Sequence, residues 1–460
     1  MRNKSAYIWG ILGKIGPQGI NLIINMILAR FLTPDDFGKI GVLAVFITVS
    51  MTLSESGLGG SLIKEDNISK KDCQTVFTFN LGISIFFYIL LFLCAYPIQY
   101  FFNIPRLENV VRSLALVFIL SAICIVPKSI MIRELRFKEL TIISIISYVI
   151  GGIVAITGCL FNWGVYALVA FQLSLVATTS ILTNYFAKYH ISIGFNYHSF
   201  KRLFSFGAFT TLCNIIDSFY ENIISILFGK FAGLSIVGYY DQAKKIETGS
   251  ANSIVTTVNL VSFPILARLR TDKIAFKYEA DSIFKYLLQY LVPILCIISI
   301  YSKEIIVILW GRNWIDAAPI LSILMLNGIV FLCESLVRNN IKSLGSVKFL
   351  ANITIIKRFI GIGIICSFLF ISDFALLYGL VVSTLLGFVM NVWLYCRIMC
   401  ISFVKQLSMY FQYLLPPVLL SGVCFVIYSY SPYNLIYNII ICAVLLCTYY
   451  GFIYRYMKRV

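Results

Sequence analysis

The first long apolar segment of the chain carries four polar side chains at helical spacing. Their positions differ by four, three and four residues, and they are Lys14, Gln18, Asn21 and Asn25. On a helix these side chains lie within an arc of about 60°. A lysine with three amides on one face could bind an anionic group and the hydroxyls of a ligand. The same face would also suit a seam between two helices, where amides hydrogen-bond across the interface.

A second polar stripe lies at a constant offset of 200 residues from the first. Two matching stripes favour one shared central cavity over two unrelated seams, and they predict an internal repeat. Six helices separate the two stripes, so both of their helices run in the same direction and the repeat is parallel. The second stripe comprises Asn214, Ser218, Glu221 and Ser225, with Asp217 one position away, and Arg30-Phe31 and Phe37-Gly38 fall on Lys230-Phe231 and Val237-Gly238.

The segment "GKIGPQG" around Lys14 has residues that allow a helix to bend. Pro17 removes a backbone hydrogen bond and clashes with the Gly13 carbonyl, while Gly13 and Gly16 permit close packing or local distortion. Lys14 lies about eight residues, or roughly 12 Å, into its helix, which is too deep to extend easily to the surface. We therefore interpret this helix as bendable and as lining a cavity that Lys14 faces. Arg30, near its other end, suits either the cavity or the membrane surface.

Four acidic residues in apolar surroundings could bind a coupling cation or pair with a lysine or arginine: Glu55, Asp217, Glu221 and Glu334. For Glu334 we prefer an ion pair with Arg338, one turn further along the helix. Other charged residues are interpreted as surface anchors or local pairs. The anchors are Lys128, Arg338, Lys357 and Arg358, and the local pairs join Lys244 and Lys245 to Asp241 and Glu247.

Composition defines the environment of these residues. Of the 460 residues 60% are hydrophobic and 12% are charged, and the mean hydropathy is +0.90. A soluble protein of this length needs more charge to cover its surface, so we predict an all-α polytopic membrane protein. The apolar runs predict about fourteen helices, at 6–31, 38–62, 75–101, 109–131, 142–161, 163–186, 203–229, 244–267, 283–309, 317–337, 350–371, 374–398, 409–430 and 435–454. We expect an N-terminal six-helix lobe at 1–187, a cytoplasmic linker at 188–202, a C-terminal six-helix lobe at 203–400, and two extra helices at 401–460.

Lysine and arginine gather in alternate connectors, which places both termini in the cytoplasm by the positive-inside rule. The formal net charge of +17 is explained by this bias and by attraction to anionic lipid headgroups. Basic residues scattered over thin loops argue against nucleic-acid binding. Most of the thirteen cysteines lie inside apolar runs and none forms a C-x-x-C pair. We expect no cofactor, no metal and no catalytic residue.

Several stretches taken together resemble one family over essentially the whole chain. They are "ILARFLTPDDFGKIGVLAVFI", "SGLGGSLIKEDNISKKDCQTVFTFNLGISI", "VPKSIMIRELRFKEL", "VGYYDQAKKI" and "FPILARLR". They are similar to the polysaccharide transporter family, the flippases of lipid-linked oligosaccharide in the multidrug/oligosaccharidyl-lipid/polysaccharide exporter superfamily.

The resemblance implies two six-helix lobes around a V-shaped cavity in the bacterial inner membrane. It implies movement of an undecaprenyl-pyrophosphate-linked repeat unit of O-antigen, capsule or exopolysaccharide to the outer leaflet. It leaves open cation coupling and association with the polysaccharide polymerase and chain-length machinery. The lining expected for such a substrate is Lys14, Gln18, Asn21, Asn25, Arg30, Asn214 and Ser218.

Two other functional classes of membrane protein are alternatives. A cation-coupled small-molecule exporter of the same superfamily would share the fold, and a central lysine argues against it. A membrane-embedded polymerase or acyltransferase would need a large catalytic loop or clustered acid and base residues. No connector exceeds about seventeen residues, and no phosphate-binding glycine loop precedes a helix in an aqueous domain.

Overall fold

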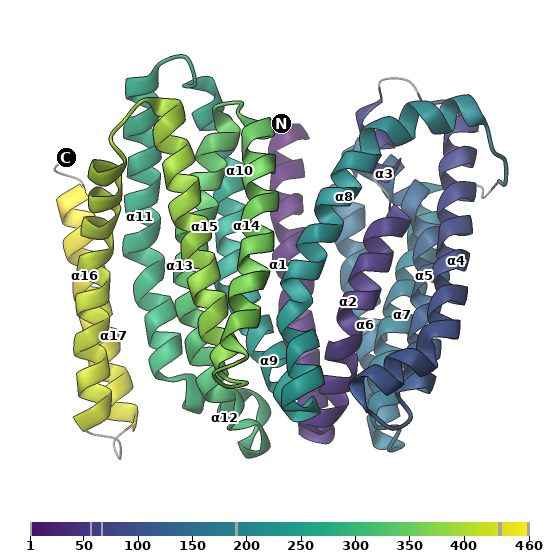
Figure 1. The fold of residues 1–460 in the computed structure, drawn as a ribbon, viewed down its shortest axis with the longest axis horizontal. Coiled ribbons are helices and arrows are strands. Elements are labelled where there is room, and N and C mark those ends of the chain that lie inside the picture. The colour runs from purple at the N-terminus through teal and green to yellow at the C-terminus, as the bar shows by residue number, and fades with distance from the viewer. Residues whose placement is uncertain (1, 56–57, 66–67, 189–191, 431–434, 458–460) are drawn as a thin grey trace. The chain divides into compact units, whose positions relative to one another are not determined.

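The computed structural model describes residues 2–55, 58–65, 68–188, 192–430 and 435–457, and Figure 1 shows its ribbon. All regular structure within these ranges is helical. The chain forms two compact units, Met1–Gln242 with Leu309–Trp314 and Ala243–Ile308 with Ile315–Val460. Each unit is described by itself below.

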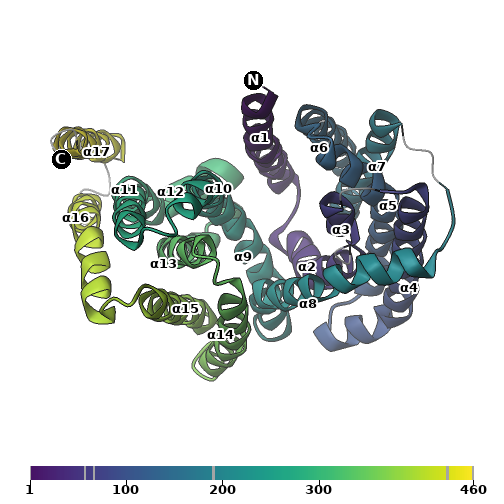
Figure 2. The same ribbon diagram turned by 90° about the horizontal axis from the view of Figure 1, so that it is seen from above.

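The helix at the centre of the first unit is α5, in which two thirds of the most apolar stretch is buried. The helix α5 packs on α4 and α7, α7 packs on α6, and α6 packs on α1, while α8 packs on α2 (Figure 2). The elements are α1 (Arg2–Phe31), α2 (Pro34–Glu55), α3 (Leu58–Lys64), α4 (Lys70–Phe102), α5 (Leu107–Arg133), α6 (Phe137–Leu160), α7 (Val165–Ala187), α8 (Tyr197–Leu227), a π-helical turn (Phe228–Ala232) and the first part of α9 (Leu234–Glu247).

The helix at the centre of the second unit is α13, in which two thirds of the most apolar stretch is also buried. Around α13 lie α10, α11 and α15, while α14 packs on α15 and α16 packs on α11 and α17. The elements are a π-helical turn (Thr248–Asn252), α10 (Ser253–Arg268), α11 (Lys273–Ile300), α12 (Ser302–Trp310), α13 (Ala317–Ser343), α14 (Val347–Phe368), α15 (Ala375–Met399), α16 (Phe403–Tyr430) and α17 (Leu435–Met457). The 3₁₀ turn Arg312–Trp314 belongs to the first unit.

Ten helices in the described ranges are long and apolar enough to cross a membrane. The expected helical segments coincide with observed helices. The segment 38–62 is covered by α2, described to Glu55, and by α3, described from Leu58. Residues 56–57 lie outside the described part. The segment 283–309 begins ten residues earlier than expected, at Lys273, and is divided at Tyr301. The segment 244–267 begins ten residues earlier, at Leu234, because tertiary packing holds the polar sequence "GYYDQAKKIE" in a helix.

Candidate functional site

The first turns of α2 and α9 cross at two glycines that are 200 residues apart. A Cβ atom placed on Gly38 would lie 2.1 Å from the Leu234 carbonyl oxygen, and one placed on Gly238 would lie 2.1 Å from the Pro34 carbonyl oxygen. Real Cβ atoms do not approach other atoms this closely, so only glycine fits at either position. Pro34 and Leu234 are also 200 residues apart. The crossing therefore has the reciprocal contacts of a local two-fold relation.

Further contacts at this offset extend the crossing. The Ser235 hydroxyl donates to the Asp35 carboxylate, again across 200 residues. A Cβ on Gly41 would lie 2.1 Å from Oδ2 of Asp241, so the glycine leaves room for that carboxylate. The Ser225 hydroxyl of α8 donates to Oδ1 of the same carboxylate at 3.2 Å. The first turns of α2 and α9 are thus joined by backbone proximity and by the exposed hydrogen bond between Ser235 and Asp35, while Asp241 joins α9 to α8.

Trp314 covers this crossing within the first unit. Its side chain is fully buried, and its indole N–H donates to the Ala29 carbonyl of α1 at 3.0 Å. Its ring meets Phe37 of α2 edge-on at 5.3 Å and Tyr239 of α9 at 6.0 Å between centroids. One tryptophan therefore joins the end of α1 to the starts of α2 and α9, and this end of the unit is tightly packed.

The polar face of α8 is used partly for packing on α2. Ser218 and Thr52 share a hydrogen bond of 3.3 Å between their hydroxyl oxygens, and the Asn222 amide donates to the Thr48 hydroxyl at 3.2 Å. Both bonds are helix-to-helix contacts of the seam type that the sequence left open. Asn214, one turn before Ser218, is exposed. The stripe is therefore divided between a seam with α2 and an exposed edge.

The polar face of α1 is also divided. The buried Asn25 amide donates to the Asn21 carbonyl and to Oδ1 of Asn21, at 2.7 and 2.8 Å, whereas Gln18 and Arg30 are exposed. The Lys14 backbone is helical, but its side chain lies outside the described part of the structure, so the expectation placed on it stays a prediction.

The residues expected to bend α1 lie within a continuous helix. α1 runs from Arg2 to Phe31 and includes the buried Pro17. A Cβ on Gly13 would lie 2.6 Å from the Thr141 hydroxyl of α6, and that hydroxyl donates to the Trp9 carbonyl at 3.0 Å. Gly13 therefore permits close packing of α1 on α6. Gly16 has only a side-chain methyl of Ile145 nearby, at 3.9 Å from its hypothetical Cβ.

The four expected acidic residues are in different environments. Asp217 is half-buried and Glu221 is exposed on α8, while the Glu55 side chain lies outside the described part. Glu334 is buried and pairs with the buried Lys357 of α14. We expected Arg338 as its ion-pair partner, but the close pair is made with Lys357 and Arg338 contributes only a more distant charge. The expectation that Lys357 lies at the membrane surface was wrong. A Cβ on Gly387 of α15 would touch the Glu334 carboxyl at 3.3 Å, so three helices enclose this pair and prevent Lys357 from extending outwards.

One further buried acid was missed in the sequence. The Glu247 side chain is only 6% exposed, and its Oε1 accepts a hydrogen bond of 3.0 Å from the Asn327 amide of α13. A π-helical turn, Thr248–Asn252, follows it directly, and π-turns inside helices are frequent at functional sites. The expected local pairing of Glu247 is supported by an electrostatic interaction with Lys244, whereas helical spacing gave no indication of the distant Asn327.

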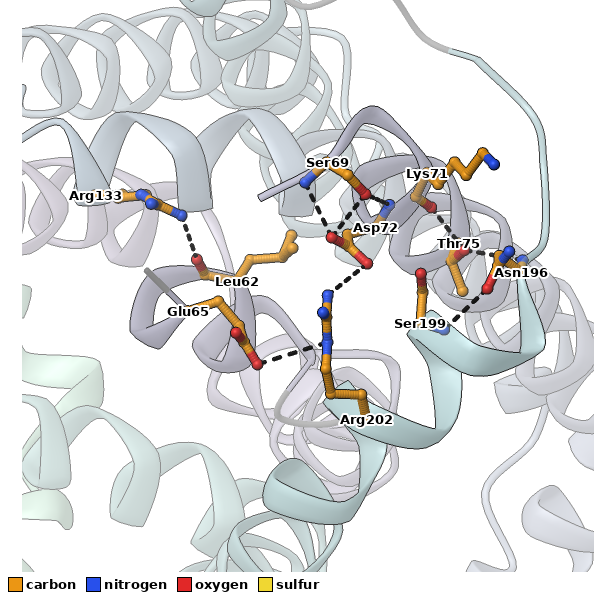
Figure 3. Close-up of polar contacts among 10 residues, drawn as sticks. All are labelled: Leu62, Glu65, Ser69, Lys71, Asp72, Thr75, Arg133, Asn196, Ser199 and Arg202. Atoms are coloured by element: carbon orange, nitrogen blue, oxygen red, sulfur yellow. Dashed lines mark hydrogen bonds and ion pairs between the residues drawn. The ribbon is translucent and has the colours of Figure 1, made fainter. Parts of the chain in front are cut away.

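Polar contacts also fix the start of α8 to α4 (Figure 3). An Arg202 nitrogen lies 2.8 Å from Oδ1 of Asp72, and another lies 3.8 Å from Glu65. Asp72 closes a capping box with Ser69 at the start of α4. The Asn196 side chain accepts from the Ser199 N–H at the start of α8, which is N-capping.

The connector before α8 is held by backbone donors as well. The N–H groups of Gly194 and Asn196 donate to the hydroxyls of Thr78 and Thr75 on α4, both at 3.0 Å. The start of α8 is therefore bound to α4, and its polar face to α2. Among the residues that the structure describes, no group of three or more histidine, cysteine or acidic side chains could hold a metal ion.

Comparison with known proteins agrees with this architecture. A family model described as "Polysaccharide biosynthesis protein" matches residues 27–319. The chain belongs to this family. Teichuronic acid biosynthesis protein TuaB of Bacillus subtilis is 28% identical over 279 residues, or 60% of this chain and 58% of that protein. Lipopolysaccharide biosynthesis protein WzxC of Escherichia coli is 24% identical over 70% of this chain and 66% of its own length. The resemblance to polysaccharide transporters is confirmed.

Solved structures show the fold of this family member. The lipid II flippase MurJ in its inward closed conformation matches with a TM-score of 0.78 and 13% identity, over 98% of this chain and 100% of that one. An inward-facing multidrug resistance MATE family transporter of the MOP superfamily matches with a TM-score of 0.65 and 13% identity, over 83% and 94% of the two chains. These likenesses concern the fold alone. The family is therefore one of polysaccharide biosynthesis proteins, and the fold is the one that these two transporters share.

Proposed function

We propose that this chain is a flippase for undecaprenyl-pyrophosphate-linked oligosaccharide repeat units in a bacterial inner membrane. It moves them from the cytoplasmic to the outer leaflet by alternating access. The named roles of relatives such as TuaB and WzxC in polysaccharide biosynthesis support this proposal. The lipid diphosphate and the sugars of such a substrate cannot cross hydrocarbon unaided, so a polar path is required.

The observation that carries the proposal is the reciprocal crossing of α2 and α9. The contact at the crossing itself is made by two glycines and two carbonyls, and Trp314 packs beside it on Phe37 and Tyr239. Opening then requires that α2 and α9 separate as rigid bodies. The positive-inside rule assigns this end to the outside, because the connector before α2, "TPDDFGK", is short and acidic. We propose that the crossing is the outer gate and that it is closed in this state.

The proposed topology has fourteen spans. To the ten apolar spans we add α1, α2, α8 and α17, which are 30, 22, 31 and 23 residues long and therefore long enough to cross about 30 Å of hydrocarbon. Both termini then lie in the cytoplasm. The six-helix lobes at 1–187 and 203–400, and the extra pair of helices after residue 400, remain part of this proposal.

Substrate contact is assigned to the polar faces of α1 and α8. Lys14 offers a counter-charge to the diphosphate, and the exposed Gln18 and Asn214 can hydrogen-bond sugar hydroxyls. We place Arg30 beside this gate, because the carbonyl of its neighbour Ala29 accepts the hydrogen bond from Trp314, which covers the crossing. Asn25 and Ser218 contribute by holding these faces in place, through the hydrogen bonds of Asn25 to Asn21 and of Ser218 to Thr52.

Cation coupling is assigned to buried or half-buried acids. The candidates are Glu247, which is buried beside the Asn327 amide, and Asp217, which is half-buried on α8. Glu334 is not among them, because it pairs with Lys357. A buried carboxyl in a membrane helix typically marks an ion path. Glu247 has a neutral amide partner in Asn327, so binding of a proton or sodium ion there would change the charge of the site.

Deletion of the gene tests the proposed function. We expect loss of the surface polysaccharide and accumulation of lipid-linked repeat units that face the cytoplasm. Restoration by the wild-type gene on a plasmid is the control. Normal surface polymer in the deletion strain, with no second transporter of this family in the genome, would refute the proposal. Movement of cationic dyes by the purified protein would instead favour a small-molecule exporter.

A further inference from the structure

A hollow of about 530 Å³ lies beside the first four turns of α11, from Lys273 to Tyr286, in the second unit. One wall is α11 itself, and the other comes from the connection between α15 and α16 and from Tyr413 of α16. Its charged residues are Lys273, Lys277, Asp281 and Lys285, which recur every four residues and so share one helix face. Three lysines against one aspartate leave two excess positive charges.

The aspartate of the hollow is held in place by two partners. Oδ2 of Asp281 lies 2.7 Å from Nζ of Lys277, and Oδ1 accepts a hydrogen bond of 2.8 Å from the Gln406 amide of α16. Lys273 donates to the Ile398 carbonyl at 3.3 Å, and the Lys285 ammonium lies 5.8 Å from the ring centroid of Tyr413. The lysines are therefore anchored around the hollow.

The wall formed by α16 is rigid. The Tyr410 side chain is 1% exposed and stacks on Phe284 of α11 at 3.9 Å between ring centroids. Gln406, one turn earlier, is also buried and makes the bond to Asp281. Because buried side chains join α11 to α16 directly beside the hollow, the two helices that form its walls are held at a fixed spacing.

The depth of the hollow corresponds to the lipid headgroup level. α11 has 28 residues, about 42 Å at 1.5 Å per residue, whereas the hydrocarbon core is about 30 Å thick. The helix is apolar up to Ile300, so the excess of roughly eight residues lies at the lysine end. Lys273 and Lys277 are then at headgroup depth, and Lys285 reaches it by extending its side chain along the helix. The exposed Tyr278 and Tyr286 are typical of this interface.

We propose that this hollow binds the phosphate of an anionic phospholipid of the surrounding leaflet. Basic pockets between membrane helices bind such headgroups, and lysine ammonium groups bind phosphate as point charges. The neutral polar side chains of the lining are one serine and three tyrosines, which offers little to an oligosaccharide. The site lies in the second unit and its binding does not depend on transport of any substrate.

Binding of defined lipids to the purified full-length chain tests this assignment. Native mass spectrometry in detergent would measure the affinity for cardiolipin and phosphatidylglycerol, with phosphatidylcholine as the neutral reference. The test variant changes all three lysines of the hollow to glutamine. Each lysine near a membrane surface contributes about fivefold to the affinity for anionic lipid, and Lys277 contributes less because it is paired with Asp281. We therefore expect the variant to bind anionic lipid roughly 25- to 100-fold more weakly. Phosphatidylcholine binding should not change.

The control variant removes the same charge elsewhere, with Lys70→Gln, Lys128→Gln and Lys201→Gln, all exposed residues of the first unit. It should bind anionic lipid within about twofold of wild type. Asp281→Asn keeps an acceptor for Gln406 and removes the one negative charge, so it should bind anionic lipid several-fold more tightly. This gain keeps the proposal testable even if the triple variant of the hollow folds poorly.

Four results would overturn the proposal. The triple variant of the hollow could bind anionic lipid as wild type does, or the control could lose as much affinity, which would indicate net charge alone. Loss of binding to a polyprenyl diphosphate lipid with phospholipid binding intact would assign the hollow to the transported lipid instead. Unchanged lipid affinity in Asp281→Asn would also contradict the assignment, because that charge lies inside the hollow.

Discussion

Alanine at either glycine of the α2–α9 crossing should open the proposed outer gate. The alanine Cβ would lie 2.1 Å from a carbonyl oxygen, and ordinary contact begins at 3.4 Å, so the helices must separate by the difference, about 1.3 Å. Such overpacking typically costs about 1–3 kcal/mol. Because the cost falls on the closed state alone, the ratio of open to closed protein should rise roughly five- to 150-fold.

Cysteine labelling measures this shift. In a background without native cysteines, Ser225→Cys places a thiol beneath the crossing, where the serine is 1% exposed. An impermeant maleimide added outside should label this thiol slowly in the parent and at least fivefold faster with Gly38→Ala or Gly238→Ala. The two variants should increase the labelling rate by similar factors. The double variant should increase it by less than the product of these two factors, because one separation of the helices relieves both clashes.

A matched control is available in the same unit. A Cβ on Gly82 of α4 would meet no atom within 4 Å, so Gly82→Ala should label like the parent and be normally abundant in the membrane. If Gly38→Ala and Gly238→Ala label and complement polysaccharide export as Gly82→Ala does, the crossing is not a gate and the argument from its geometry fails.

Three other changes give separate tests. Asp35→Cys with Ser235→Cys should form a disulfide across the crossing, block export in complementation and release it on reduction, whereas export by the oxidised protein would contradict the gate. Glu334→Gln or Lys357→Met alone removes one partner of the buried ion pair. Each should therefore lower the free energy of unfolding by about 3–5 kcal/mol. The double variant should recover most of that loss, and equal losses in all three would argue against the pair. Lys14→Ala should lose most export at normal membrane abundance, by roughly ten- to a hundredfold for a charge-assisted contact of about 1.5–3 kcal/mol, and Lys14→Arg should retain part of it. Wild-type export by Lys14→Ala would remove Lys14 from the site.

The sequence by itself determined the membrane class, the helical segments and the family. Apolar length and helical periodicity are local properties of a chain, because a helix satisfies its own backbone and hydrocarbon requires that it do so. The offset of 200 residues was visible in the sequence as well, through Phe37-Gly38 and Val237-Gly238. The start of α9 was misplaced, because the polar residues in its second half interrupt the apolar run, and the close approach of its first turns to α2 is a tertiary contact.

Only the tertiary structure decided how the polar residues are used. Lys357 was expected at the surface, and it is buried against Glu334 because α13, α14 and α15 enclose it. Glu247 finds its partner Asn327 eighty residues away, and Gln406 reaches Asp281 across 125 residues. Helical spacing shows which side chains share a face. It does not show which face of another helix lies opposite. In the low dielectric of a membrane protein, the residues on that opposite face decide whether a charged side chain binds a ligand, forms an ion pair or anchors the helix at the surface.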